Sequence, residues 1–294
     1  GIEKQASDFA AEVAAAAGVN ARYAREWLEY MAVAGLIDVF EQSDNPDARR
    51  YAFRPGSADA FCDEAGEVPD LHDAMFLLSG LLQFERLTAA YKAGTGLPFS
   101  AFGELGRVSQ ERSTRLAYSR DLAGHWLPSL GTLHERLLGE AGGRIADIGF
   151  GGGWSTIALA KAYPLATVDG LDLDPASVEL AAANAAVEGL GDRIQFRVRD
   201  AGDPDLQATY DLVCAFECLH DFTQPVQVLR AMRRLLRPGG VLLVGDPGGD
   251  DLFRAPDSDD VRLNYGFSLF HCLPVGMDGE QAVGTGAVMR EATV

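Results

Sequence analysis

The sequence predicts an α/β protein in which a Rossmann-like doubly wound sheet follows an N-terminal all-helical winged-helix domain. From residue 144 onward, short apolar strands alternate with helical stretches, which is typical of a parallel sheet covered by helices. The first of these strands runs directly into a glycine cluster at a helix start. Residues 7–56 show two helical stretches, a strand, a polar turn that would form a wing, and a returning strand.

Composition excludes several functions. The chain has 294 residues, of which 47% are hydrophobic, enough for one large domain and a smaller one. Its formal net charge of −18 disfavours nucleic acid and anionic membranes as partners, because Lys and Arg must neutralise phosphates in such complexes. No apolar run approaches the roughly 20 residues of a membrane span, and no charged-then-apolar leader opens the chain. We therefore expect a soluble, cytoplasmic protein.

The cysteines support the same location. Cys62, Cys214, Cys218 and Cys272 fit neither C-x-x-C metal spacing nor a dense disulfide framework. They are most simply buried thiols in a reducing cytoplasm. No set of His, Cys and acidic residues has metal-ligand spacing along the chain, so we predict no metal site.

The stretch from Arg144 to Trp154 is the most informative part of the chain. It is an apolar strand that contains Asp147 and ends in glycines, which let backbone N–H groups approach a nucleotide or nucleoside at a helix N-terminus. The dinucleotide fingerprint G-x-G-x-x-G would need glycine at position 154, where Trp154 stands. The pattern present is D-x-G-x-G-x-G, formed by Asp147, Gly149, Gly151 and Gly153.

This pattern resembles the first motif of class I S-adenosylmethionine-dependent methyltransferases. Asp172 ends the next apolar strand, about 20 residues past the glycines, where an acid can reach ribose hydroxyls. A third strand ends in Asp200 and Ala201, a pair that lies beside the adenine in the family. The stretches 210–222 and 236–246 look like the family's fourth and fifth strands. Several motifs in the family's order make the resemblance much more specific than the glycines alone.

The resemblance implies S-adenosyl-L-methionine as methyl donor and S-adenosyl-L-homocysteine as product. Phe150 stands where the family often has a small residue or cysteine, close to the donor's methionine moiety. Other interpretations stay open for single residues, since glycines can serve tight packing and strand-end acids can be N-caps or surface groups. The cofactor-binding residues that the resemblance implies are Asp147, Gly149, Phe150, Gly151, Gly153, Asp172, Leu173, Asp200, Ala201 and Phe216.

A general base is the second chemical requirement. Methyl transfer from a sulfonium is an in-line displacement, so the enzyme must first position the reactants. A phenol or alcohol acceptor is mostly protonated at neutral pH, and histidine is the side chain best matched to remove its proton. The run Leu219–Phe222 resembles the histidine-aspartate pair of winged-helix O-methyltransferases, with Phe222 where the family usually has tryptophan. The resemblance implies that His220 is the catalytic base of a metal-independent reaction. The alternative is a histidine that only packs against the next helix.

The N-terminal module contains a helix-turn-helix. Asn20 is a good N-cap for a helix that places Tyr23, Trp27 and Met31 on one face and stops at Gly35. Small-molecule O-methyltransferases of plants and bacteria use a similar module for dimerisation and to wall the substrate pocket. The resemblance therefore implies a homodimer that methylates a small-molecule acceptor. Oxygen is the acceptor atom that we expect, because the similar enzymes are O-methyltransferases.

A winged-helix transcription regulator with a nucleoside-sensing methyltransferase-like domain is the alternative function. The second helix offers Arg22 and Arg25 to a DNA groove, but it also carries Glu26 and Glu29. The segment as a whole is net acidic, which disfavours contact with phosphates.

The expected domain limits are 1–56 for the winged helix, 57–127 for a helical connector that covers the pocket, and 128–294 for the S-adenosylmethionine-binding domain. Within the connector, the apolar stripe of Asp70–Tyr91 indicates core or dimer interface rather than a substrate box. The family's sheet has seven strands, whereas we predict five, so we expect the C-terminal strands to be missing from the sequence as given. The predicted strands are at about 144–150, 166–173, 194–200, 210–218 and 240–246.

Overall fold

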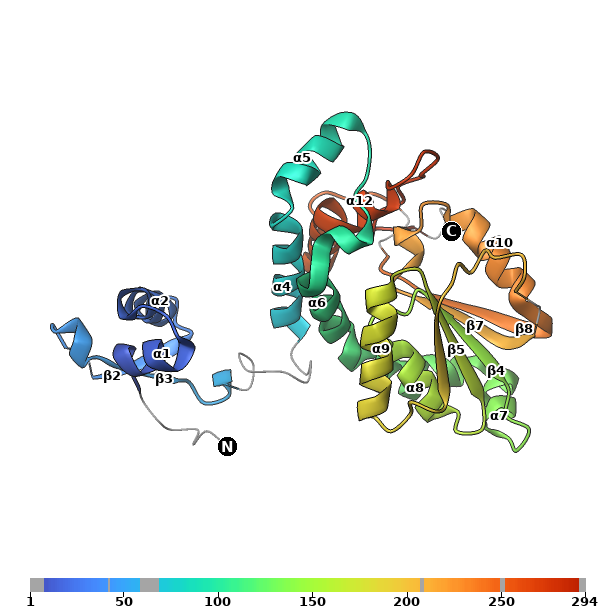
Figure 1. The fold of residues 1–294 in the computed structure, drawn as a ribbon, viewed down its shortest axis with the longest axis horizontal. Helices are drawn as coiled ribbons and strands as arrows, with labels where there is room; N and C mark the ends of the chain where they lie inside the picture. Colours follow the sequence, from blue (N-terminus) through green and yellow to red (C-terminus); the bar gives the residue numbers. More distant parts are fainter. Residues whose placement is uncertain (1–7, 42, 59–68, 207–208, 249–251, 291–294) are drawn as a thin grey trace. The chain divides into compact units, whose positions relative to one another are not determined.

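The chain forms two compact units, residues 1–71 and 72–294. The computed structural model, drawn in Figure 1, describes residues 8–41, 43–58, 69–206, 209–248 and 252–290. Residues 72–127 thus belong to the same unit as the sheet. The predicted limits of the winged helix, connector and donor-binding domain stay predictions.

The first unit is a winged helix. Helices α1 (Ala10–Ala17) and α2 (Ala21–Val33) form the helix-turn-helix, and three antiparallel strands in the order β1-β3-β2 add a small sheet to it. The bounds of these strands are Asp8–Phe9 for β1, Ile37–Glu41 for β2 and Arg50–Phe53 for β3. Asn20 caps α2 as predicted, because its side chain accepts a hydrogen bond of 2.9 Å from the Arg22 N–H.

The apolar face predicted on α2 is only partly buried. Leu28 and Met31 lie in the core of this unit, whereas Tyr23 is 76% exposed and Trp27 is 49% exposed. The buried residues of α2 are Ala24, Leu28 and Met31, at i, i+4 and i+7 spacing, so the two aromatic residues lie beside the buried face.

The second unit contains a five-stranded parallel sheet in the order β6-β5-β4-β7-β8. The predicted strands are all present, and β8 starts earlier than expected, at Leu236. The strand bounds are Arg144–Ile148 for β4, Thr167–Asp172 for β5, Ile194–Val198 for β6, Tyr210–Phe216 for β7 and Leu236–Gly245 for β8. The strand order reverses at β4, and ligands of such sheets bind outside the carboxyl ends of the strands at this point.

Helices cover both faces of the sheet, which confirms the doubly wound class (Figure 1). Successive strand residues point to opposite faces. Leu212 therefore joins a core cluster with Ile157 of α8, while Val213 joins a second cluster with Met232 of α10. The helix bounds are Trp154–Ala162 for α8, Pro175–Val187 for α9 and Pro225–Leu235 for α10.

The remaining helices precede and follow the sheet. In the predicted apolar stripe, α4 buries Phe76 but leaves Met75 and Leu78 partly exposed, and Leu82 is exposed as well. None of the described helices is long and apolar enough to span a membrane. The helix bounds are Pro69–Leu81 for α4, Phe84–Ala93 for α5, Gly103–Leu116 for α6 with a π-helical continuation to Trp126, Thr132–Leu138 for α7, Asp259–Phe267 for α11 with a π-helical continuation to Cys272, and Leu273–Gly276 for α12.

Candidate functional site

The glycine turn connects β4 to α8 and uses its glycines for two purposes. Gly151 has a φ of +52° and open space where a side chain would project, so its backbone faces a cavity. Gly153 has a φ of +82°, and a Cβ there would lie 2.6 Å from the Cβ of Ala181 on α9. The first glycine exposes the backbone, whereas the second permits close packing of two helices.

Asp147 lies behind this turn. Its side chain is fully buried and accepts hydrogen bonds from the hydroxyls of Ser155 (2.6 Å) and Thr156 (2.7 Å) in the first turn of α8. Burial raises the pKa of Asp147 to about 6, although both hydrogen bonds oppose the shift. Asp147 therefore fixes the start of α8.

Asp172 ties the end of β5 to the glycine turn. Its carboxylate accepts hydrogen bonds from the N–H groups of Gly151 (3.0 Å) and Asp174 (2.9 Å). Burial raises the pKa of Asp172, and these backbone hydrogen bonds counteract the shift. The same carboxylate faces a cavity, so it can accept further hydrogen bonds from a ligand.

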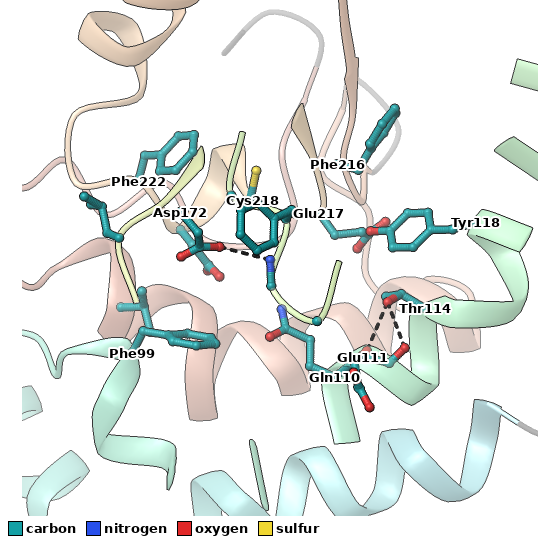
Figure 2. A pocket seen from close by; sticks show the side chains of 17 residues that line it. Phe99, Gln110, Glu111, Thr114, Tyr118, Asp172, Phe216, Glu217, Cys218 and Phe222 are labelled. Atoms are coloured by element: carbon teal, nitrogen blue, oxygen red, sulfur yellow. Dashed lines mark hydrogen bonds between the residues drawn. The ribbon is translucent and has the colours of Figure 1, made fainter. Parts of the chain in front are cut away.

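The glycine-turn cavity, as we call it, has a volume of about 180 Å³ (Figure 2). Six predicted cofactor residues line it: Gly149, Phe150, Gly151, Asp172, Leu173 and Phe216. Asp147, Gly153, Asp200 and Ala201 do not, and Asp200 instead lines a neighbouring cavity that shares Leu173, Asp221, Phe222 and Val275 with the first. The sequence interpretation missed the other lining residues, which are Phe99, Gln110, Glu111, Thr114, Tyr118, Gly152, Glu217, Cys218, Asp221, Phe222 and Val275.

A second cavity, here the histidine cavity, adjoins the first and has a volume of about 220 Å³. The two share Gln110, Thr114 and Glu217 in their linings. The further lining residues of the histidine cavity are Asp73, Phe76, Ser113, Ala117, His220, Pro247, Asn264, Phe267, Cys272 and Ala287.

His220 is held by an acid that the sequence interpretation missed. It lies in the 3-10 turn Leu219–Asp221, and its Nδ1 hydrogen-bonds to Asp246, just past β8. Asp246 also accepts a hydrogen bond of 3.2 Å from the Leu219 N–H. An ionised carboxylate can only accept, so the Nδ1 donates, and in the neutral form of the ring the lone pair lies on Nε2. Burial alone would lower the pKa of His220, but Asp221 and the hydrogen bond with Asp246 outweigh it and hold the pKa well above its usual range.

Glu217 stands between the two cavities in an uncommon backbone conformation. Its φ is +54°, the left-handed region that a residue other than glycine rarely adopts. Burial raises the pKa of this carboxyl to about 7. Its place in the sequence, directly after an apolar strand, gave no sign of this conformation.

Cys272 also joins the site from a distant segment. His220, Asp221 and Cys272 bring potential metal-ligand atoms within 4.8 Å of one another. The prediction of no metal site used spacing along the chain, which cannot reveal a cysteine brought in by the helix at 268–272. A cluster that could bind a metal does not show that methyl transfer needs one. The metal independence of the reaction stays a prediction.

Helix α6 closes both cavities from one side. Arg107 forms two hydrogen bonds, of 2.5 and 3.0 Å, with the carboxylate of Asp174, the N-cap of α9. The Asn184 amide on α9 donates to Glu111 at 2.6 Å. These contacts fix the helix that carries Gln110 and Thr114.

Comparisons with known proteins agree with this architecture. Residues 145–240 match the methyltransferase domain family, and residues 2–60 match the Rv2258c-like winged HTH domain. The chain therefore carries a methyltransferase domain preceded by a winged helix-turn-helix domain, which confirms the resemblance seen in the motifs.

Its relatives act on small molecules. The chain is 36% identical to the 27-O-demethylrifamycin SV methyltransferase of Amycolatopsis mediterranei over 135 residues, which are 42% of this chain and 49% of that one. It is 32% identical to the erythromycin 3''-O-methyltransferase of Saccharopolyspora erythraea over 168 residues, 53% of this chain and 54% of the relative. The chain thus spans about half the length of the curated relatives it matches.

Solved structures establish the fold. An O-methyltransferase family protein from Burkholderia thailandensis matches with a TM-score of 0.68 at 20% identity, over 98% of this chain and 81% of that one. The mitomycin 7-O-methyltransferase MmcR matches with a TM-score of 0.66 at 19% identity, over 98% of this chain and 80% of that one.

Proposed function

We propose that this protein transfers a methyl group from S-adenosyl-L-methionine to a hydroxyl of a small-molecule acceptor. The observation that carries the proposal is the junction of the two cavities. One is walled by a glycine turn and by Asp172, and the other by His220, and they share Gln110, Thr114 and Glu217. A donor in the first cavity and an acceptor in the second would meet at this shared wall, as in-line displacement requires.

Each group has a defined task in this mechanism. The Asp172 carboxylate would accept hydrogen bonds from the ribose hydroxyls, and the exposed backbone of Gly151 would let the donor lie close to the turn. Asp200 and Ala201 would lie beside the adenine. His220 would take the acceptor's proton on Nε2, while Asp246 holds the ring and stabilises the charge that forms. The oxygen then attacks the donor's methyl carbon as the carbon–sulfur bond breaks, leaving S-adenosyl-L-homocysteine.

Calorimetry with three ligands tests the donor. S-Adenosylmethionine and S-adenosylhomocysteine should bind, whereas NAD should not, because Trp154 replaces the third glycine of the dinucleotide fingerprint. Transfer of labelled methyl groups to a panel of phenols and alcohols then tests the reaction. Binding of NAD alone would refute the proposal.

We also propose that the protein is a cytoplasmic homodimer. Exposed apolar residues on the winged helix, such as Tyr30, Val33 and Phe40, support a surface that is covered by a second copy. Cys214, Cys218 and Cys272 are free, which is expected in a reducing compartment. Sedimentation that shows only a monomer at micromolar concentration would contradict the dimer.

The alternative function, a transcription regulator, has less support than the methyltransferase. Four of its arginines already pair with acids: Arg22 with Glu26, Arg25 with Asp47, Arg49 with Glu29, and Arg54 with Asp38. Guanidinium groups engaged in this way are poor ligands for phosphates. A gel-shift experiment at moderate salt, with and without S-adenosylhomocysteine, distinguishes the two functions.

A further inference from the structure

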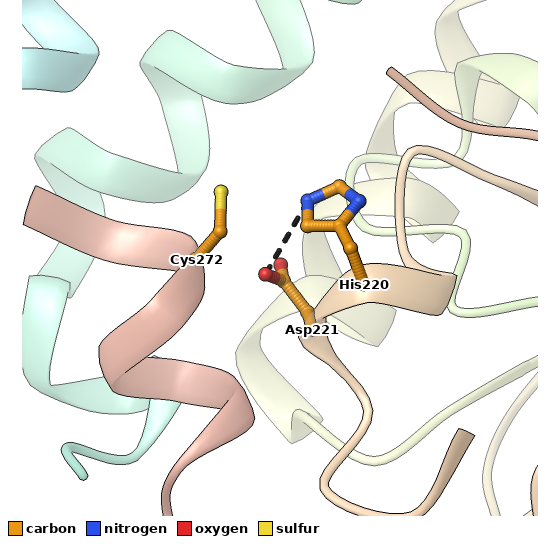
Figure 3. Close-up of side chains that lie close together, drawn as sticks. All are labelled: His220, Asp221 and Cys272. Atoms are coloured by element: carbon orange, nitrogen blue, oxygen red, sulfur yellow. Dashed lines mark ion pairs between the residues drawn. The ribbon is translucent and has the colours of Figure 1, made fainter. Parts of the chain in front are cut away.

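The side chains of His220, Asp221 and Cys272 lie close together (Figure 3). His220 and Cys272 line the histidine cavity, and Asp221 lines the glycine-turn cavity. The histidine and aspartate come from the turn after β7, while the cysteine comes from the helix at 268–272. Nitrogen, oxygen and sulfur donors thus converge from two separate segments of the chain.

The spacing of the donor atoms suits one tetrahedral ion. The Nε2 of His220 lies 3.4 Å from Oδ1 of Asp221, too far for a strong hydrogen bond. Two ligand atoms on one zinc ion lie about 3.3–3.7 Å apart, given metal–ligand bonds of about 2.0–2.3 Å. Sγ of Cys272 lies within 4.8 Å of the ligand atoms that the other two residues offer.

Two further observations point to a ligand here. Oδ1 of Asp221 is buried and makes no close hydrogen bond among the described residues, and its charged neighbour is Nε2 of His220 at 3.4 Å, an ion pair that a bound divalent ion would replace. The other ring nitrogen of His220 is bound to Asp246, the carboxylate–histidine arrangement that orients metal-ligating imidazoles.

We propose that His220, Asp221 and Cys272 form a binding site for a divalent ion of the Zn²⁺ class, and that the bound ion blocks methyl transfer. Thiolate and imidazole ligands favour such ions over Mg²⁺ or Ca²⁺, which prefer oxygen. The thiol and the protonated imidazole each release a proton to solvent when the metal binds. Inhibition rests on the proposed function, because the ion occupies the Nε2 lone pair that His220 needs as base. The metal is therefore an inhibitor and not a cofactor of the reaction.

Cobalt serves as the spectroscopic probe. Cys62 lies outside the described residues, so the experiment uses a Cys62→Ser parent to exclude a contribution from that thiol. Titration of the parent with Co²⁺ should give, at one equivalent, a near-ultraviolet sulfur-to-cobalt charge-transfer band together with tetrahedral visible bands, and Zn²⁺ should displace them. Cys272→Ser should abolish the charge-transfer band, and Asp246→Asn should weaken cobalt binding by about 10- to 100-fold.

Cys214→Ala is the matched control, because this buried thiol lies within β7 and should leave the cobalt spectrum unchanged. Circular dichroism and a cooperative urea unfolding transition report whether each variant folds. If Cys272→Ser does not fold, Asp221→Asn must weaken the cobalt spectrum instead. No charge-transfer band at saturating Co²⁺, or a band that survives in folded Cys272→Ser, would overturn the site.

The same samples separate this proposal from the proposed function. A cobalt site in a protein that binds no S-adenosylhomocysteine refutes the function alone, and the reverse result refutes the metal site alone. With an acceptor that turns over, Zn²⁺ should lower the rate and EDTA should restore it. A rate that Zn²⁺ raises, or that EDTA abolishes, would overturn the inhibitory role.

Discussion

The glycine-turn cavity and the histidine cavity adjoin, but the chain assembles them differently. The first is built mainly from consecutive strand ends, so most of its motif residues lie within one α/β layer. The second combines Asp73 of α4 with His220 and with Cys272 from the C-terminal helices, and Asp246 fixes the histidine from behind. A local set of turns therefore holds the proposed donor, whereas distant helices shape the proposed acceptor site. Changes in the two regions should have separable effects on donor affinity and on turnover.

The largest expected difference between the effect on turnover and the effect on donor affinity is at His220. His220→Ala should lower methyl transfer by about a hundredfold or more, because it removes the general base. S-Adenosylhomocysteine affinity should stay unchanged, since the imidazole lines only the histidine cavity. Turnover with labelled donor and calorimetry measure the two effects. The exposed His125 provides the control, and His125→Ala should match wild type. Near-normal turnover in His220→Ala would remove this residue from the mechanism.

Asp147 should make the free energy of unfolding depend on pH. Burial raises its pKa from 3.8 to about 6, so the folded protein binds more protons than the unfolded chain between these values. Its contribution to the free energy of unfolding therefore falls as pH rises from about 4 to about 6, by an amount on the order of 3 kcal/mol, and stays at the lower value above that range. Urea unfolding of wild type and Asp147→Asn across this range measures the difference. An identical pH dependence in both proteins would show that the carboxyl does not titrate as described.

Asp172 and Asp200 test how far the donor site extends. Asp172→Asn should weaken S-adenosylhomocysteine binding by about 10- to 100-fold, because hydrogen bonds from ribose hydroxyls to a charged carboxylate are lost. Asp200 lines only the neighbouring cavity, so Asp200→Asn should have a smaller effect. Calorimetry compares the two variants directly. If Asp200→Asn were the more damaging change, the adenine side of the donor would contribute more to affinity than the ribose contact of Asp172.

The same contrast explains what the sequence could predict. The strands and the residues Gly149, Gly151 and Asp172 follow from short-range patterns, because a strand end and the helix after it are neighbours in sequence and in space. The partners Asp246 and Cys272 come from segments far from His220, and their positions depend on how whole helices pack. The exposure of Tyr23 and Trp27 could not be predicted for a related reason, since an apolar pattern on a helix does not reveal how much of it meets the small sheet.

Arg107 lies on α6, a helix that lines both cavities, and its replacement should have the smallest effect on donor affinity. Its ion pair with Asp174 is largely buried, with side chains 14% and 12% exposed, whereas the similar pair of Arg120 and Asp121 has an arginine that is 67% exposed. Arg107→Met should lower the free energy of unfolding by about 1–3 kcal/mol, because a partly buried carboxylate loses its charged partner. Arg120→Met should leave stability unchanged within error, since water screens an exposed pair. Arg107→Met should also weaken S-adenosylhomocysteine binding slightly, because Gln110, Glu111 and Thr114 lose their anchor on α9. Reduced stability with fully retained donor affinity would mean that α6 shapes only the histidine cavity, and the division between the two regions would then be sharper than their shared lining suggests.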